Sequence, residues 1–79
     1  MHISSKANTE SVAKRILASL KQDGTCTLEA IGGKALEKAV QALEKAQEWR
    51  KETYPVEHSR HAETVEEKEK TVHVVKVYR

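Results

Sequence analysis

The first helical pattern lies near the start of the chain. Apolar side chains recur there three or four positions apart, at Val12, Ile16, Leu17 and Leu20. This spacing places them on one face of an α-helix and predicts a helix over 9–22. Asn8 or Thr9 can accept a hydrogen bond from the free N–H groups of the first turn, and Gly24 supplies the left-handed residue that ends the helix.

A second helical pattern follows in the middle of the chain. Its apolar stripe consists of Leu36, Ala39, Val40 and Leu43, widened along one flank by Ala35, Ala42, Ala46 and Trp49. The stripe predicts an amphipathic helix over 34–51. Its small alanines indicate close approach to a sheet or to another helix, and Trp49 is expected to pack on the alanine flank.

Two segments outside the helices have strand patterns in the first half of the chain. Residues 25–31 alternate, with Cys26, Leu28 and Ala30 on one face, and predict a strand with an apolar inner side. The short apolar step at residues 1–5 predicts an edge strand.

After the second helix the pattern changes to a period of two. Residues 71–78 form the strongest strand pattern of the chain. Residues 53–63 predict a polar strand with Pro55 near its start, where a missing N–H is tolerated at a sheet edge. Residues 64–70 between them are mostly charged, contain no Gly, Asn or Asp, and predict a projecting, mobile hairpin tip.

These elements give the order β-α-β-α-β-β in a single domain over residues 1–79. We predict an α+β fold, a two-layer sandwich in which two helices cover one face of a four-stranded mixed sheet. The first two strands would form a parallel crossover unit and the last two a hairpin. A chain of this size buries only about 60% of its surface on folding. The opposite face of the sheet is only partly apolar and is therefore expected to be solvated or paired with a second subunit in a homodimer.

The composition excludes several classes of protein. The single cysteine, Cys26, rules out an internal disulfide framework. No apolar run reaches the length of about 18 residues that a membrane-spanning helix needs, and the N-terminus lacks the apolar core of a signal peptide. These features predict a cytoplasmic protein without a membrane partner. The formal net charge of +2 permits nucleic acid as a partner without requiring it.

Motifs for nucleotide hydrolysis, metal binding and catalysis are incomplete. Gly32, Gly33 and Lys34 lack the remaining residues of a phosphate-binding P-loop. His58 and His61, three positions apart on a strand, would point to opposite faces and not share a metal ion. No Ser, Cys or carboxylate arrangement has the spacing of a known reaction. We therefore expect no enzyme, no cofactor and no small-molecule substrate.

A set of short motifs is shared with a known family. The motifs are Ile3, Ser4, Ser5 and Lys6; Asn8; Ser11, Val12 and Ala13; and Ala30, Ile31 and Gly32 followed by Ala35, Leu36, Ala39 and Val40. Through them the chain resembles the bacterial stage V sporulation protein S family, which is similar to the Alba superfamily of small nucleic-acid-binding proteins. The resemblance is good over residues 3–51, and over 53–79 it extends to the strand layout and the apolar last strand.

The resemblance implies a two-layer α/β homodimer that binds DNA or RNA through two regions. One is the loop between the first strand and the first helix, here with Ser5, Lys6 and Asn8. The other is the projecting hairpin of each subunit. Alba proteins usually carry two adjacent lysines in the loop, whereas this chain has Ser5 and Lys6 there.

The residues themselves are compatible with the same surfaces, and in the loop they are also compatible with ordinary capping of the helix beside one solvated lysine. Lys6 precedes a helix N-terminus, where free N–H groups and the helix dipole attract phosphate, and Lys34 lies at the start of the second predicted helix. In the hairpin, Arg60, Lys68 and Lys70 could reach phosphates. Such contacts position a nucleic-acid backbone without reading its sequence.

The charge distribution leaves an alternative open. Residues 1–51 hold nine basic and six acidic side chains, whereas 52–79 hold five basic and six acidic ones. Within 63–70, four glutamates outnumber two lysines, and these carboxylates repel phosphate. The hairpin is equally consistent with an edge whose alternating charges keep the protein soluble and discourage pairing with other strands. The alternative function for the protein is a structural or regulatory protein–protein interaction module on the same fold. The choice between DNA and RNA also stays open.

Overall fold

The computed structural model describes all 79 residues. Its elements are β1 (His2–Ile3), α1 (Thr9–Asp23), β2 (Thr25–Ile31), α2 (Gly33–Arg50), β3 (Val56–Val65) and β4 (Lys68–Tyr78). This is the predicted order, and both helices agree with the prediction to within one residue at each end. Neither helix is long and apolar enough to cross a membrane.

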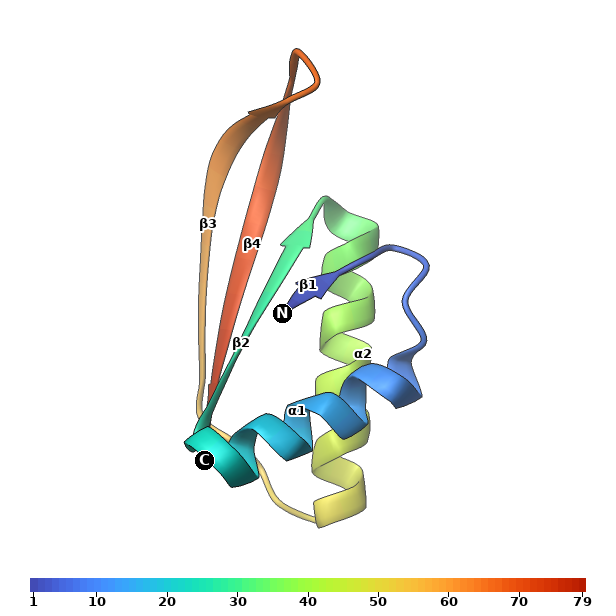
Figure 1. Ribbon diagram of the computed structural model, residues 1–79, viewed down its shortest axis with the longest axis vertical. Helices are drawn as coiled ribbons and strands as arrows, with labels where there is room; N and C mark the ends of the chain where they lie inside the picture. Colours follow the sequence, from blue (N-terminus) through green and yellow to red (C-terminus); the bar gives the residue numbers. More distant parts are fainter.

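The four strands form one mixed sheet in the order β1-β2-β4-β3. β1 runs parallel to β2, whereas β4 is antiparallel to both β2 and β3. Figure 1 shows both helices on one side of the sheet, with α1 crossing α2 and the hairpin standing clear of them. The predicted α+β architecture is therefore confirmed, with β1 and β3 as the edge strands.

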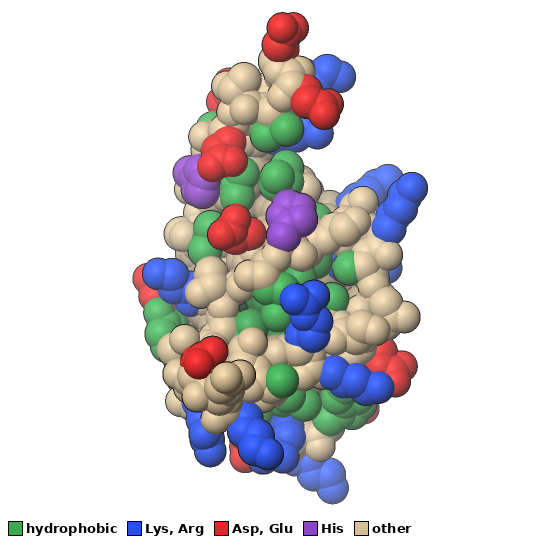
Figure 2. Space-filling model, viewed as in Figure 1, with side chains coloured by type: hydrophobic (Ala, Val, Ile, Leu, Met, Phe, Trp, Pro, Cys, Tyr) green, Lys and Arg blue, Asp and Glu red, His purple; other side chains and the backbone are tan.

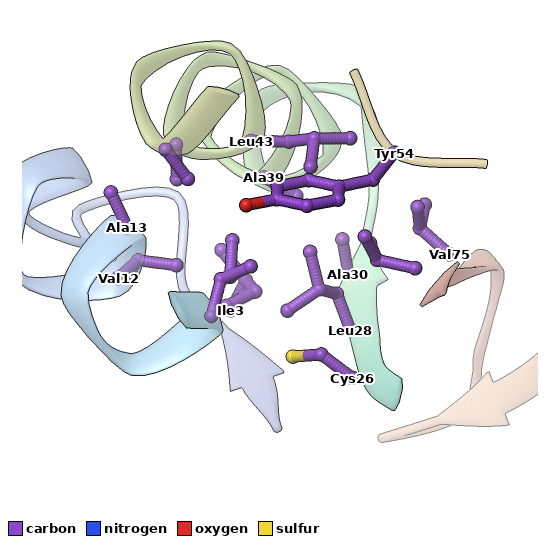
Figure 3. Packing of buried hydrophobic residues seen from close by; sticks show 14 of the residues in the cluster. Ile3, Val12, Ala13, Cys26, Leu28, Ala30, Ala39, Leu43, Tyr54 and Val75 are labelled. Atoms are coloured by element: carbon purple, nitrogen blue, oxygen red, sulfur yellow. The ribbon is translucent and has the colours of Figure 1, made fainter. Parts of the chain in front are cut away.

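The core lies between the helices and the middle of the sheet. Along β2, buried and exposed residues alternate, so Cys26, Leu28 and Ala30 face the helices as predicted. Val75 extends this face onto β4, because it pairs with Leu28. Tyr54 lies between α2 and the sheet and covers the same cluster (Figure 3). All buried residues are apolar, so burial of apolar surface holds these layers together.

The helix ends follow the local signals in the sequence. The Ser11 N–H donates to Asn8 Oδ1 at 3.0 Å, so Asn8 rather than Thr9 is the N-cap of α1. Gly24 ends α1 with a φ of 76°, as predicted. α2 ends at Lys51, which adopts a left-handed φ of 53° without being glycine.

β4 begins three residues earlier than the predicted strand over 71–78, β3 is shifted from the predicted 53–63 to 56–65, and the turn is shorter than predicted. β3 and β4 continue through the charged segment up to the pair Val65–Lys68. Only Glu66 and Glu67 form the turn, with φ values of 52° and 64°. Two left-handed residues are typical of a type I′ turn, which matches the twist of paired strands. The predicted loop over 64–70 is therefore wrong, because strand pairing outweighs an unfavourable turn sequence.

The flanks of α2 are more exposed than its apolar stripe predicts. Trp49 is 44% exposed and Val40 is 43% exposed. α2 packs against α1, β1 and β2, and these neighbours cover only the alanine-rich centre of the stripe. The predicted packing of Trp49 is therefore wrong. Val56 on β3, at 45% exposed, is the third large apolar side chain that the fold leaves open.

Candidate nucleic-acid interface

Three segments meet at one edge of the sheet. Because β1 and β2 are parallel, the chain leaves both at the same edge, into residues 4–8 after β1 and into 32–34 after β2. The hairpin projects beyond this edge, since the pairing of β2 with β4 ends at Ile31–Val72 and residues 62–71 continue past it. Figure 1 shows all three segments toward the same end of the molecule. We refer to residues 4–8, 32–34 and 62–71 as the loop-hairpin edge.

Lys6 lies in a tight turn that leaves its side chain free. The Ala7 N–H donates to the Ser4 carbonyl oxygen at 3.0 Å, and the Lys6 N–H donates to Ser4 Oγ at 3.1 Å. Ser5 and Lys6 are exposed, and Lys6 takes part in neither ion pair of the chain. The turn thus presents one cation and one hydroxyl on a hydrogen-bonded backbone.

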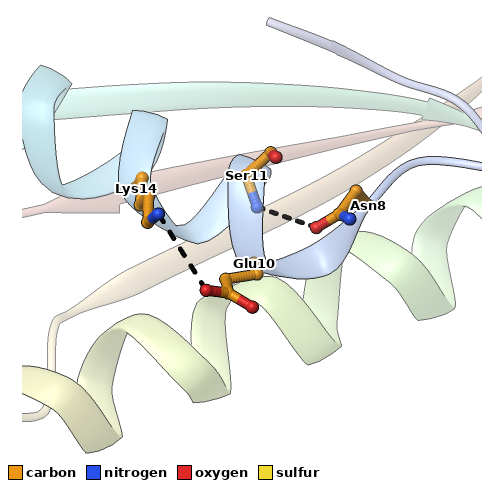
Figure 4. Close-up of polar contacts among 4 residues, drawn as sticks. All are labelled: Asn8, Glu10, Ser11 and Lys14. Atoms are coloured by element: carbon orange, nitrogen blue, oxygen red, sulfur yellow. Dashed lines mark hydrogen bonds and ion pairs between the residues drawn. The ribbon is translucent and has the colours of Figure 1, made fainter.

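Asn8 serves mainly to cap α1. Its Oδ1 accepts the Ser11 N–H (Figure 4), which leaves the side-chain amide N–H groups to donate outward. Glu10 in the first turn pairs with Lys14 at 3.9 Å (Figure 4). A carboxylate there stabilises the helix but lowers the positive potential beside Lys6. The N-terminus of α1 alone is therefore a weak phosphate site.

The start of α2 is a more open anion site. Its N-cap, Gly32, has no side chain to bond the free N–H groups, and no acidic residue lies in the first turn. Lys34 is exposed in that turn. The Gly32 N–H donates to the Thr71 carbonyl oxygen at 3.0 Å, which ties the helix start to the base of the projecting hairpin. Free N–H groups beside a lysine favour a phosphate oxygen.

The hairpin does not bring its three candidate cations together. Residues of β4 that pair with the buried side of β2, such as Val75, face the helices. By alternation, Lys68 and Lys70 lie on the opposite face. Arg60 pairs with His73 on the helix-facing side. The structure therefore groups Lys68 with Lys70 and separates both from Arg60.

Carboxylates surround the two hairpin lysines. Glu63 is the cross-strand neighbour of Lys70, yet its Oε1 lies 3.1 Å from Nε2 of His61 instead. No carboxylate comes within ion-pair distance of Lys68 or Lys70. Figure 2 shows acidic and basic atoms next to each other at the projecting end. Both ammonium groups are free to bind an anion, but in an acidic neighbourhood.

Sequence reasoning missed a histidine pair on the helix-facing side of the hairpin. Nε2 of His58 lies 3.1 Å from Nδ1 of His73. The pKa of His73 is lowered, first by burial and then by repulsion from His58 and Arg60. The pair could have been found from the strand register. A two-residue turn at 66–67 places both histidines on one face, whereas a loop over 64–70 defines no register.

Metal-binding and nucleophilic side chains are not grouped. His58 and His61 lie on opposite faces of β3, as predicted. No group of three or more His, Cys, Asp or Glu side chains could hold a metal ion. Cys26 is buried, and burial raises the pKa of its thiol against weaker opposing effects of Ser19, the N-terminus and Arg15. A buried neutral thiol is a poor nucleophile.

Comparison with known families gives one result that covers nearly the whole chain. The model of the family described as Stage V sporulation protein S (SpoVS) matches residues 1–78. The match includes the hairpin, beyond the residues 3–51 on which the sequence motifs lie. No curated protein matches the chain.

Proposed function

Because the chain belongs to the stage V sporulation protein S family, we propose that it is a non-enzymatic, Alba-like nucleic-acid-binding protein that acts as a homodimer. The observation that carries this proposal is the loop-hairpin edge. It presents four exposed lysines that form no ion pair: Lys6, Lys34, Lys68 and Lys70. Together with the free N–H groups of α2, they would hold backbone phosphates without reading the bases.

Binding by one chain is expected to be weak. The formal net charge is only +2, and the glutamates of the hairpin repel phosphate. A dimer doubles the charge and presents two loop-hairpin edges, so that both can engage one strand with avidity.

The open flank of α2 supports a second copy as the dimer partner. The Tyr54 N–H donates to Gln47 Oε1 at 2.9 Å, so this flank faces the segment that enters β3. Val40 lies two turns before Gln47 on the same flank, and Val56 follows Tyr54 on the same side of the extended chain. No residue of β3 is buried. A second copy here would cover two exposed valines and an edge strand that the single chain leaves open.

The mass in solution tests this dimer surface. We expect light scattering to give twice the mass of one chain, and Val40→Glu or Val56→Glu to give a monomer. Trp49→Glu is the matched control, because Trp49 is equally exposed on the other flank of α2 and should leave the dimer intact. A monomer in the unaltered protein, or dissociation by Trp49→Glu alone, would contradict this surface.

Salt dependence tests nucleic-acid binding. Fluorescence anisotropy with labelled duplex DNA and single-stranded RNA, at roughly 50 and 200 mM salt, should show affinity falling with a log–log slope of about −0.9 per phosphate contact for the duplex. We expect Lys6→Glu and Lys34→Glu to weaken binding, and Lys45→Glu, three turns further along α2, to leave it nearly unchanged. The nucleic acid that binds more tightly, DNA or RNA, is the preferred ligand. Absence of binding to both at the lower salt would contradict the proposal.

A second candidate function, protein–protein interaction without nucleic acid, is favoured by the acidic turn. Glu66 and Glu67 are exposed at the far end of the hairpin and suit a basic protein surface. The double variant Glu66→Gln with Glu67→Gln distinguishes the two functions. It should strengthen nucleic-acid binding by removing repulsion, but weaken binding to a basic protein partner.

A further inference from the structure

A surface hollow of about 420 Å³ lies between the C-terminal ends of α1 and α2 and the last residue of the chain. It is on the far side of the molecule from the loop-hairpin edge. Figure 2 shows Lys and Arg atoms gathered at this lower end, where Figure 1 places the C-terminus. The charged lining residues are Lys21, Arg50, Glu52 and Arg79, and the apolar ones are Leu17, Ala18, Leu20 and Tyr54.

The cations of the hollow have no partner within the chain. Both ion pairs of the protein involve other residues, and no side-chain hydrogen bond is donated by Lys21, Arg50 or Arg79. Basic side chains at helix ends often bond the last carbonyl groups. Here none of the three cations forms such a bond, and backbone N–H groups occupy only some of the carbonyls, since Gly24 donates to Leu20 and Lys51 to Gln47 and Glu48. The three cations are therefore available to a ligand because no group of the chain binds them.

The floor of the hollow is apolar and held in place. Tyr54 is only 8% exposed, and its backbone N–H is fixed by Gln47 Oε1 at 2.9 Å. The Arg79 N–H donates to the Gly24 carbonyl oxygen at 2.9 Å, which fixes the base of that side chain. Leu17 is half-buried beside them. An apolar floor next to a few convergent polar groups is the usual composition of a small-molecule site.

We propose that this hollow binds a phosphorylated small molecule of nucleotide size. Its phosphate would lie among Lys21, Arg50 and Arg79, and its planar or apolar part would lie on Leu17 and Tyr54. A phosphate monoester carries up to two negative charges and accepts bidentate hydrogen bonds from arginine. It therefore matches three basic side chains beside one acidic side chain better than a ligand with a single carboxylate would. The volume falls in the range of about 300–1,000 Å³ that is typical of ligand pockets. The nucleotide could be free, or it could be the phosphorylated end of a strand.

Amide chemical shifts measured by NMR on the full chain test the site directly. We expect adenosine 5′-monophosphate to shift the signals of Leu20, Tyr54 and Arg79, and adenosine or inorganic phosphate alone to bind at least about tenfold more weakly. Arg50→Gln combined with Arg79→Gln should weaken the nucleotide about tenfold or more. Lys14→Gln, an exposed lysine two turns before Lys21 on the same helix, is the matched control and should have no effect.

A second titration separates the two sources of the nucleotide. A 5′-phosphorylated dinucleotide and its dephosphorylated form are compared in the Lys6→Glu, Lys34→Glu variant, so that the loop-hairpin edge does not contribute. Tighter binding of the phosphorylated dinucleotide than of the mononucleotide assigns the hollow to strand ends, and equal binding assigns it to free nucleotides. The proposal is overturned if phosphate alone binds as tightly as the nucleotide, or if the arginine variant binds it unchanged. Neither result depends on the proposed function.

Discussion

The body of the protein and its projecting hairpin are stabilised in different ways. In the body, α1, β2 and α2 enclose a cluster of buried apolar residues, including Ile16, Leu28 and Ala42. In the hairpin, no residue of β3 is buried, and residues 62–71 are held by cross-strand pairing, by the turn and by one bond from the Gly32 N–H to the Thr71 carbonyl oxygen. The body depends on packing, and the hairpin depends on backbone hydrogen bonds and turn geometry. Because the side chains of residues 62–71 are not needed for packing, this projecting part of the hairpin is the region whose charges are free to serve a partner.

Removal of a core side chain should show the difference between the two regions most strongly, because it should cost much more stability than removal of a hairpin side chain. Leu28 is fully buried, so Leu28→Ala is expected to lower the free energy of unfolding by about 2–5 kcal/mol. Val65→Ala in the hairpin should change it by less than about 0.5 kcal/mol. Urea denaturation followed by circular dichroism measures both. A similar loss from the two variants would show that the hairpin has a core of its own.

The cap of α1 links the body to the candidate interface. Asn8→Ala removes the bond to the Ser11 N–H, and we expect a loss of about 1 kcal/mol in the free energy of unfolding. Lys6→Ala, two residues earlier, should leave stability unchanged and reduce nucleic-acid binding. The same denaturation experiment, combined with the anisotropy titration, tests this division of roles. The division of roles is contradicted if Lys6→Ala destabilises the protein as much as Asn8→Ala does.

The turn is the place where the hairpin can be improved. Glu66 and Glu67 both have positive φ, and Asn followed by Gly is the preferred pair for a type I′ turn. Left-handed backbone costs a non-glycine residue about 1–2 kcal/mol, and the greater freedom of glycine in the unfolded chain offsets roughly 0.5–1 kcal/mol of that gain. Glu66→Asn with Glu67→Gly is therefore expected to raise the free energy of unfolding by up to about 1 kcal/mol. The control is Glu66→Gln with Glu67→Gln, which changes the charge equally and leaves the turn preference unimproved. Equal stabilisation by both variants would assign the effect to charge.

The smallest expected effect is the pH response of the histidine pair. The pKa of His73 is lowered from an ordinary value of 6.5, by burial, His58 and Arg60 in that order. Its contribution to stability is therefore present above that value and is lost as the pH falls through the lowered pKa in the folded state. NMR titration should give a His73 midpoint below 6.5 in the native protein, partly restored by His58→Ala. A His73 midpoint at or above 6.5 would contradict the contact.

The elements that the sequence predicts well are those with local causes. The two helices follow from apolar spacing, from the cap at Asn8 and from the stop at Gly24, all within a few residues of each other. The inner face of β2 follows from simple alternation. The register of the hairpin does not follow from local signals, because Glu66 and Glu67 are not residues that usually form a two-residue turn. Only the pairing of the two strands over 56–78 places the turn there.

The candidate sites show the same division. The sequence alone identifies Lys6 and Lys34 as lysines near helix N-termini, because a helix start and its neighbours are close in the chain. Their placement at one edge with the hairpin depends on the parallel pairing of β1 with β2, which no local signal determines. The exposure of Trp49 and the hollow beside Tyr54 likewise depend on how the layers cross.

The sequence by itself therefore determined the order of elements, the apolar faces and the family resemblance, since periodicity, capping and short motifs act over a few residues. The tertiary structure alone decided the two-residue turn, the separation of Arg60 from Lys68 and Lys70, and the cluster of unpaired cations at the opposite end. These features join residues that are distant in the chain, and their positions depend on strand register and helix crossing.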